Sequence, residues 1–537
     1  MVYEKKPTVI EEYLMSSPRI RLRYSGFIAL GSSLAVTAIG FAFTVMVTRR
    51  LSINDYGIWS TMGVLSSYFA MWIPSVYSYW ITRDSARGRY DSARTGINIS
   101  FIFGVICTVL YAVIAVPVAN RLNANYWYFI LFSLYILFSF CSSSYQAAAR
   151  GTKPEHLHLS DLTATIVKVA VGYLLLIVLN LELTGIILAS IFYMIVRVLH
   201  YRWVMHGAIS KGKVKLELVK DWLSKCWIPL IEITAFILLQ LDVMVVAMIT
   251  GSSEAVAHYR VVQLYMQAIT SVGLVAIGLY PSLLSSPEET DVKRTLTESI
   301  NLVMFLGVPA VLGIIASADH LLALLRMEYL TNSNTLRIAA ACALLTICAS
   351  ILNTALTGTE KIDLNEKTTL RAYVKSTLFT VGVGYWALPA VVLPLIAWIS
   401  QAFMSSPVEL VFLWYVVYII GTVIYLLYLG VLAKKSRVPI EIDLKTIASV
   451  VFSAVLSVLF VILCGQHLVV SYSFWTMLGN IIILLAVGCS YPVLLYITSS
   501  WFRKLITDAI SFLKTWFKDL LLMFVSFLKT LKSPYRE

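Results

Sequence analysis

Residues 101–150 read FIFGVICTVLYAVIAVPVANRLNANYWYFILFSLYILFSFCSSSYQAAAR. The stretch contains two apolar runs, and each is long enough to cross a bilayer as a helix of about 20 residues. A short polar link containing Arg121 separates the runs, and the next charged residue is Arg150. Because lipid offers the backbone no hydrogen-bond partners, such runs must satisfy their own backbone groups as helices. The stretch therefore predicts two transmembrane helices joined by a tight turn.

The same pattern recurs from residue 24 almost to the end of the 537-residue chain. Hydrophobic residues make up 59% of the chain and charged residues 13%, whereas a soluble domain carries about 25% charged residues. The runs are too continuous for the alternating strands of an outer-membrane barrel. We therefore predict an all-α polytopic membrane protein with about fourteen transmembrane helices. The predicted spans are residues 24–47, 57–82, 96–119, 126–149, 162–180, 184–204, 227–250, 261–284, 301–325, 336–357, 372–398, 410–433, 447–466 and 473–497.

The distribution of basic residues tests this count, because cytoplasmic loops carry an excess of Lys and Arg. With the N-terminus inside, cytoplasmic segments hold 34 of the 42 basic residues and external segments hold 6. A miscounted helix would invert every later loop and remove this asymmetry. We expect a multi-pass protein of the cell (plasma) membrane with both termini in the cytoplasm. The formal net charge of +13 then reflects topology and contact with membrane lipids, not nucleic-acid binding.

The longest cytoplasmic connection is basic and follows the sixth span, which suggests a linker between two halves. Beyond the fourteenth span, apolar residues continue at helical spacing, but a further crossing would bury Lys514, Lys518 and Asp519 at a cost of a few kcal/mol each. An amphipathic helix on the cytoplasmic face is preferable. The predicted organisation is a cytoplasmic N-terminal segment (1–23), two six-helix lobes (24–204 and 227–433) joined by a linker (205–226), two additional spans (447–497) and a basic amphipathic tail (501–537).

Enzymatic motifs are absent from the sequence. It contains no G-x-x-x-x-G-K-[ST] phosphate loop, no H-E-x-x-H zinc helix and no G-x-S-x-G nucleophile elbow. External loops are too short for a catalytic domain. We therefore expect a transporter, without a catalytic residue, metal site or cofactor other than a coupling ion, H⁺ or Na⁺.

Charged residues at membrane depth are costly and usually face a cavity or the interior of a helix bundle. Asp242 lies some fifteen residues into the seventh span, and Glu232 lies nearer its cytoplasmic end. Asp242 has two interpretations, an ion or proton site that faces a cavity, and a buried partner of an arginine. Both place its carboxylate inside the protein.

The basic candidates are more numerous. Lys168 and Arg197 lie about two turns inside adjacent spans, where they either face a cavity or extend to the interface. Arg49 and Arg50 end the first span on the external side, against the charge rule, and Arg260 begins the eighth span similarly. Together these residues predict a cationic passage suited to a phosphate-linked solute, since unpaired phosphate charge is prohibitively costly in hydrocarbon.

Several stretches, taken in order, resemble one family, the oligosaccharide-flippase branch of the multidrug/oligosaccharidyl-lipid/polysaccharide (MOP) exporter superfamily. The chain departs from the family pattern at His258, where glycine is usual, and at Arg326–Met327, where Phe-Gly is more typical. The similarity covers roughly residues 20–435. The stretches are VTRRLSINDYGIWS (47–60), YQAAARGTKPEHLHLSDLTATIVKVAVGYLLLIV (145–178), the Asp242-bearing span, ITGSSEAVAHYRVVQLY (249–265), LYPSLLSS (279–286), NLVMFLGVPAVLGIIASADHLLALLRMEYL (301–330) and ALTGTEKIDLN (355–365).

The resemblance implies a MATE-like fold with two six-helix lobes around a central cavity that opens to one side at a time. It also implies a flippase that carries polyprenol-linked oligosaccharide to the outer leaflet for surface polysaccharide or glycoprotein assembly, with surface-glycan assembly enzymes as further partners. On this hypothesis Arg49, Arg50, Lys168, Arg197 and Arg260 bind substrate, and Asp242 and Glu232 serve coupling or gating.

Three alternatives stay open at this point. The first is a cation-coupled exporter of drugs or other small molecules from the same superfamily, which would favour an acidic, aromatic cavity. The second is a polytopic glycosyltransferase or polymerase, which usually needs a long external loop with acidic residues. The third is a scaffold for surface-glycan enzymes, which needs no charged interior.

Overall fold

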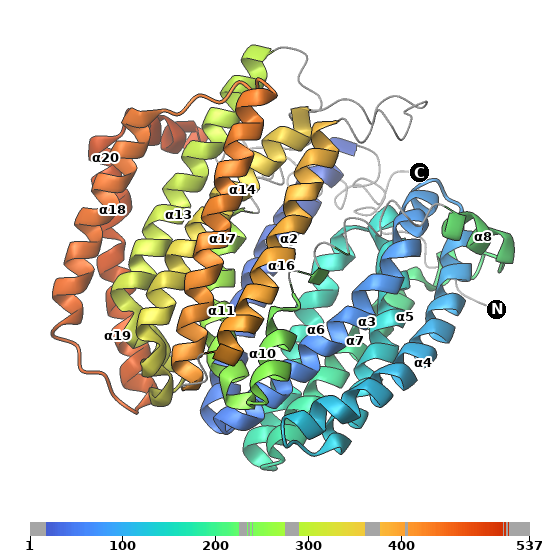
Figure 1. The fold of residues 1–537 in the computed structure, drawn as a ribbon. Coiled ribbons are helices and arrows are strands. Elements are labelled where there is room, and N and C mark those ends of the chain that lie inside the picture. Colours follow the sequence, from blue (N-terminus) through green and yellow to red (C-terminus); the bar gives the residue numbers. More distant parts are fainter. Residues whose placement is uncertain are drawn as a thin grey trace, which may run out of the picture.

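A computed structural model describes residues 18–224, 234, 237–238, 240–273, 289–359, 376–402, 406–508, 510–511 and 514. All regular structure in this part of the chain is helical (Figure 1). The elements are α2 (Pro18–Arg50), α3 (Ile53–Ala86), α4 (Tyr90–Arg121), α5 (Tyr126–Thr152), α6 (Glu155–Tyr173), the π-helical η1 (Leu174–Val178), α7 (Glu182–Ile209), α8 (Leu216–Ser224), α10 (Asp242–Thr250), α11 (Ser253–Thr270), α13 (Glu289–Leu325), the 3₁₀ helix η3 (Met327–Asn332), α14 (Ser333–Thr359), α16 (Thr377–Ala402), α17 (Pro407–Lys435), α18 (Leu444–Gly465), α19 (Phe474–Gly488) and α20 (Ser490–Thr498).

Ten helices in the described ranges are long and apolar enough to cross a membrane, and they coincide with ten of the predicted spans, the third to sixth and the ninth to fourteenth. The first two predicted spans fall within α2 and α3, which are 33 and 34 residues long. The seventh and eighth are only partly covered by described residues. The predicted all-α polytopic architecture is confirmed.

Several helices are longer than the spans predicted for them. The clearest case is α13, which begins at Glu289, well before the predicted start at residue 301. Hydropathy detects only the part of a helix that lies in hydrocarbon, whereas charged and polar residues also continue a helix into water. In α13 this extension carries an ion pair between Arg294 and Glu298, one turn apart, at 3.0 Å.

The helices form two bundles, with α18–α20 added at one edge against α13 (Figure 1). We call α2–α7 the N-terminal bundle and α10–α17 the C-terminal bundle. The predicted linker, 205–226, contains the end of α7 and the short helix α8, whose Trp222 is buried against Tyr77 of α3. The predictions for residues 1–17, for Glu232 and for the tail after Lys514 lie outside the described residues.

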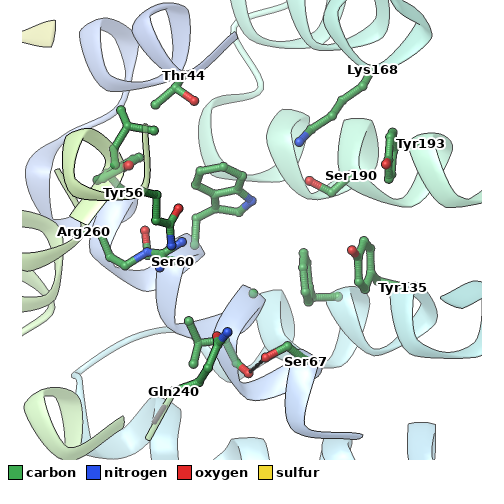
Figure 2. Close-up of a pocket in the computed structure, with 16 residues that line it drawn as sticks. Thr44, Tyr56, Ser60, Ser67, Tyr135, Lys168, Ser190, Tyr193, Gln240 and Arg260 are labelled. Atoms are coloured by element: carbon green, nitrogen blue, oxygen red, sulfur yellow. Dashed lines mark hydrogen bonds between the residues drawn. The ribbon is translucent and has the colours of Figure 1, made fainter. Parts of the chain in front are cut away.

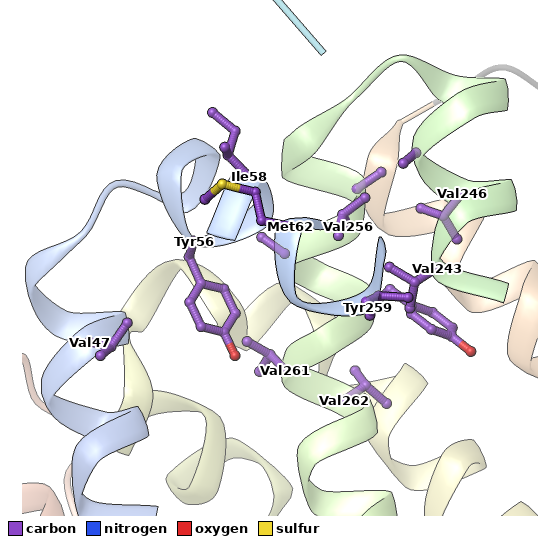
Figure 3. Close-up of a cluster of buried hydrophobic side chains, with 14 of the residues drawn as sticks. Val47, Tyr56, Ile58, Met62, Val243, Val246, Val256, Tyr259, Val261 and Val262 are labelled. Carbon is purple, nitrogen blue, oxygen red and sulfur yellow. The ribbon is translucent and has the colours of Figure 1, made fainter. Parts of the chain in front are cut away.

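The two bundles meet most closely where α3 packs against α11. A Cβ atom at Gly57 would lie only 1.8 Å from the carbonyl oxygen of Ser253, so this contact requires glycine. Buried apolar side chains from both bundles surround the contact in one cluster, with Ile58 and Met62 on α3 facing Val256 on α11 (Figure 3). The end of the molecule at which α2 ends and α3 begins is therefore closed, and we call it the closed face. It is the face predicted to be external.

Candidate functional site

A cavity of about 340 Å³ lies between the bundles, on the inner side of the α3–α11 contact (Figure 2). Aromatic rings, hydroxyl groups and amides line it, together with two cations. Among its described lining residues there is no carboxylate. The lining residues are Thr44, Tyr56, Trp59, Ser60, Gly63, Val64, Ser67, Phe132, Tyr135, Lys168, Ser190, Tyr193, Gln240, Arg260, Leu264 and Gln267.

Lys168 enters the cavity from α6 of the N-terminal bundle. Its ammonium nitrogen lies 4.4 Å from the ring centroid of Phe43, 5.8 Å from that of Trp59 and 5.7 Å from that of Tyr193. No carboxylate in the described part of the chain forms an ion pair with it. Cation–π contacts offset part of the cost of burying a charge, so the ammonium group keeps the capacity to bind an anion.

Arg260 faces the same cavity from α11 of the C-terminal bundle (Figure 2). Its guanidinium donates a hydrogen bond to Oε1 of Gln263, one turn later on the same helix. Within the described ranges Arg260 also has no ion-pair partner. The structure thus brings two of the five predicted basic residues, Lys168 and Arg260, to one cavity from opposite bundles.

Asp242 is not among the residues that line the cavity; it lies behind them. Its side chain is 6% exposed, and its Oδ2 accepts hydrogen bonds from the hydroxyl of Tyr259 and from Nε2 of Gln263, the latter at 3.4 Å. Oδ1 accepts the backbone N–H of Val243 at 2.7 Å. Of the two interpretations, a direct pairing with an arginine is not observed among the described residues, because Arg260 reaches Asp242 only through Gln263.

Within the predicted seventh span, residues 227–250, the described residues include a break just before Asp242. Gln240 and Leu241 form a turn, and α10 begins at Asp242. A carboxylate at a helix N-terminus is favoured by the exposed N–H groups and by the helix dipole. Irregular backbone at membrane depth is tolerated where it borders a cavity, and Gln240 does line this cavity.

Arg197 does not line the cavity. Its Nε lies 3.0 Å from Oδ1 of Asp161 on α6, and its guanidinium lies over the rings of Tyr193 and Tyr201. Neither of the two sequence-based interpretations included this ion pair. Asp161 lies one residue before the predicted fifth span, and an acidic residue at that membrane edge could have suggested a partner for Arg197.

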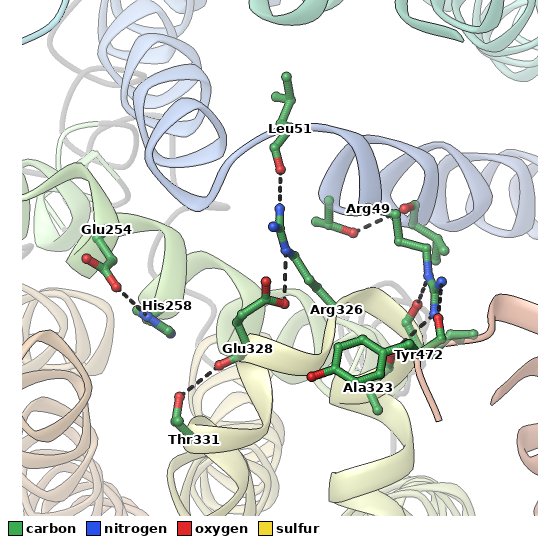
Figure 4. A network of polar contacts seen from close by, with 12 residues as sticks. Arg49, Leu51, Glu254, His258, Ala323, Arg326, Glu328, Thr331 and Tyr472 are labelled. Carbon is green, nitrogen blue, oxygen red and sulfur yellow. Dashed lines mark hydrogen bonds and ion pairs between the residues drawn. The ribbon is translucent and has the colours of Figure 1, made fainter. Parts of the chain in front are cut away.

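Arg49 does not line the cavity either and lies at the closed face (Figure 4). Its guanidinium donates to the carbonyl oxygens of Leu324 at 2.8 Å, Ala323 at 3.3 Å and Tyr472 at 3.1 Å, and it lies 5.2 Å from the ring centroid of Phe474. The first two carbonyls belong to the last turn of α13, where a cation is favoured. Arg50 is exposed and does not line the cavity either.

Two further arginines join the bundles at the closed face in the same way. Arg121, at the end of α4, donates to the carbonyls of Met248 and Ile249 in α10. Arg326, after α13, donates to the carbonyl of Leu51 before α3 and pairs with Glu328 at 3.0 Å (Figure 4). We call Arg49, Arg121 and Arg326 the arginine latch. The sequence signal for the latch was present, since all three arginines occupy predicted external segments.

His258 lies near the latch on α11 and is 3% exposed. Its ring contacts the side-chain amide of Asn332 at 2.6 Å and the carboxylate of Glu254 at 3.6 Å. It also packs edge-on against Tyr329. The histidine that stands here in place of the family's usual glycine therefore forms a polar contact between α11 and η3.

A second cavity, of about 470 Å³, is lined mainly by apolar side chains of α11, α13, α18, α19 and α20. Its lining residues include Pro309 and Gly313 of α13 and Leu484 and Leu485 of α19. It lies where the two additional C-terminal spans pack on the C-terminal bundle.

A sequence model of the family described as polysaccharide biosynthesis protein matches residues 45–334. No curated protein sequence matches the chain. Among solved structures, the lipid II flippase MurJ in an inward closed conformation is similar over 89% of this chain and 100% of its own, with a TM-score of 0.63 and 14% identity.

Two further structures are similar to the chain. An inward-facing MATE family multidrug transporter of the MOP superfamily has a TM-score of 0.55 and 14% identity, over 75% of this chain and 96% of its own. A eukaryotic MATE transporter has a TM-score of 0.53 and 12% identity, over 81% of this chain and 99% of its own. The expected MOP fold is confirmed.

Proposed function

This chain belongs to the polysaccharide biosynthesis protein family, and we propose that it is a flippase for a polyprenol-phosphate-linked oligosaccharide. In this proposal it moves the substrate from the cytoplasmic to the outer leaflet by alternating access, for surface polysaccharide or glycoprotein assembly. The observation that carries the proposal is the pair of cations, Lys168 and Arg260, that reach one cavity from opposite bundles without a carboxylate partner in the described residues.

A phosphate group matches this pair of cations. Charge-assisted hydrogen bonds from ammonium and guanidinium groups to phosphate are stronger than neutral ones. Because the two cations belong to different bundles, a bound phosphate would connect the bundles and favour their approach. The hydroxyl groups of Ser60, Ser67 and Ser190 and the ring of Trp59 supply hydrogen bonds and an apolar face for the attached sugars.

The apolar second cavity suits the lipid part of the same substrate. Burial of hydrocarbon away from water is favourable by about 25 cal/mol for each Å². An isoprenoid chain is therefore more stable in apolar surroundings than in the polar cavity. A surface lined by Pro309, Gly313, Leu484 and Leu485 offers it apolar contacts beside α13. The headgroup and the tail would then occupy separate parts of the protein.

Alternating access requires the closed face to open. In this proposal the arginine latch holds that face shut while the cavity loads from the cytoplasmic side, and the latch must release before the headgroup leaves. The substrate-binding role expected for Arg49 is therefore replaced in our proposal by a gating role. Arg197, held by Asp161, supports Tyr193 at the cavity wall.

Export of a cationic drug fits the cavity less well. A cationic client would need an accessible carboxylate, and Asp242 is covered by Tyr259 and Gln263. A drug would also meet two uncompensated positive charges. The flippase is therefore the better match to the site.

The test is translocation by the purified protein in liposomes, with a fluorescent lipid-linked oligosaccharide and a membrane-impermeant quencher. Lys168→Ala and Arg260→Ala are each expected to lower the initial rate by at least about tenfold, the effect of losing a contact worth about 1.4 kcal/mol. Lys434→Ala, an exposed cation at the end of α17, is the matched control. Unchanged rates in both cavity variants, or efflux of a cationic dye in place of lipid translocation, would refute the proposal.

A further inference from the structure

Gln263 connects the cavity to the buried acid behind it. On one side its Oε1 accepts a hydrogen bond from the guanidinium of Arg260, and on the other its Nε2 faces Oδ2 of Asp242 at 3.4 Å. A guanidinium has only donors and a carboxylate only acceptors. This orientation of the amide is therefore the one that satisfies both neighbours at once.

We propose that Gln263 is a positioning residue that couples the binding of an anion at Arg260 to the binding of a cation at Asp242. The inference rests on the proposed function, which places the substrate phosphate at Arg260. The inference adds a connection between the substrate site and the coupling-ion site, and this connection is the neutral side chain of Gln263.

The coupling follows from competition for the guanidinium of Arg260. A phosphate oxygen forms a stronger hydrogen bond with it than the neutral carbonyl of an amide does. When phosphate binds, Gln263 loses the contact that fixes its orientation and is free to turn away from Asp242. The buried carboxylate then keeps fewer donors, and an undercompensated buried charge is costly. A cation, H⁺ or Na⁺, consequently binds Asp242 more tightly.

The surroundings of Asp242 support this connection. Arg260 is the one cation near it in the described residues, and the remaining ionisable groups are phenols that are neutral at neutral pH. These groups are Tyr68 from α3, Tyr259 from α11, and Tyr415 and Tyr418 from α17. Arg121, which also contacts α10, binds carbonyls at the opposite end of that helix. The amide of Gln263 is thus the direct polar connection from the cavity to the acid.

The proposed coupling is reciprocal and can be measured by binding alone. The probe is geranyl diphosphate, titrated by calorimetry into the full-length protein in detergent. One series varies pH at constant salt, and the other exchanges sodium chloride for choline chloride at constant pH. In the wild type we expect the affinity to rise about 5- to 150-fold, the usual range of allosteric coupling, either on acidification or on addition of sodium. The two series distinguish a proton from a sodium ion.

Two variants separate positioning from a merely structural role. Gln263→Met has nearly the same shape but lacks both polar contacts, and we expect it to bind the probe with an affinity that no longer depends on pH or sodium. Gln267→Met, one turn along α11, removes a cavity amide that has no bond to Asp242 and should keep the wild-type dependence. The titration of the probe's own phosphates is common to all variants and cancels in the comparison.

The outcomes distinguish this inference from the proposed function. If the wild type does not bind the probe, or if Arg260→Ala binds it equally well, the proposed anion site is wrong. If the wild type binds the probe with an affinity that is independent of both pH and sodium, the anion site stands and the coupling is refuted. The same conclusion follows if Gln263→Met retains the wild-type dependence.

Discussion

Single charged residues in this molecule differ in how their charge is compensated. Lys168 contacts aromatic rings, Arg260 contacts an amide, and Arg197 contacts a carboxylate. Only the first two therefore keep their charge available to a ligand. The ion pair of Arg197 instead stabilises the packing of α6 on α7, and its loss should affect folding more directly than transport.

We predict that Asp161→Ala destabilises the protein by about 2–3 kcal/mol, because it leaves Arg197 partly buried without its partner. The value lies below the range for fully buried pairs, since the Asp161 side chain is 35% exposed and solvent screens it. Thermal unfolding in detergent measures the loss. The double variant Asp161→Leu/Arg197→Met should recover most of it, and a double variant less stable than Asp161→Ala would contradict this account.

At the scale of elements, α11 connects the closed face to the cavity. Its first residue, Ser253, touches Gly57 of α3, His258 contacts Asn332, and Arg260 lines the cavity. A helix transmits a displacement along its length, so opening of the α3–α11 contact would also move Arg260. The same helix carries Gln263, which places the proposed coupling on this element too.

The α3–α11 contact gives a prediction with a control on the same helix. Gly57→Ala places a methyl group 1.8 Å from a backbone oxygen, whereas a Cβ at Gly63 meets nothing within 4 Å. Gly57→Ala should therefore cost about 1–3 kcal/mol through overpacking, seen as a lower unfolding midpoint and a lower translocation rate. Gly63→Ala should keep the unfolding midpoint or raise it slightly, because alanine is the better helix former. Equal midpoints for the two variants would show that the bundles do not meet as described.

At the scale of the whole molecule, two bundles enclose a cavity and are held together at one end by the arginine latch. All three latch arginines bind backbone carbonyls of the opposite bundle or of its neighbouring spans, and two of the sites are helix ends. Carbonyl groups at a helix end attract cations, so the latch is a set of reversible contacts. A closed face built in this way can open without burying an unpaired carboxylate.

Removal of latch contacts should shift the molecule toward a state that is open on the closed face. We predict that Arg49→Ala/Arg326→Ala increases the labelling rate of a cysteine at Ser67→Cys, in a chain without its native cysteines, by an impermeant maleimide added from outside. The loss of contacts worth about 1.5–3 kcal/mol corresponds to a rate increase of about tenfold or more.

Arg337→Ala provides the control, since its ion pair with Asp319 at 3.0 Å stays within the C-terminal bundle. This variant should label at the wild-type rate. Acceleration by Arg337→Ala, or none by the latch variant, would contradict the gating role of the latch.

The sequence by itself determined the helical membrane class, the order of the helices and the set of charges that need explanation. Apolar run length and the bias of Lys and Arg between loops are local properties, so they can be read without knowing how helices pack. The tertiary structure alone decided that Lys168 and Arg260 line one cavity, that Arg197 pairs with Asp161, and that Arg49 binds the end of α13. These arrangements depend on the rotation of each helix about its axis and on contacts between segments that are distant in the sequence. Hydropathy does not report helix rotation or long-range contacts, because the hydropathy of a segment is the same whichever neighbour its charged side chain contacts.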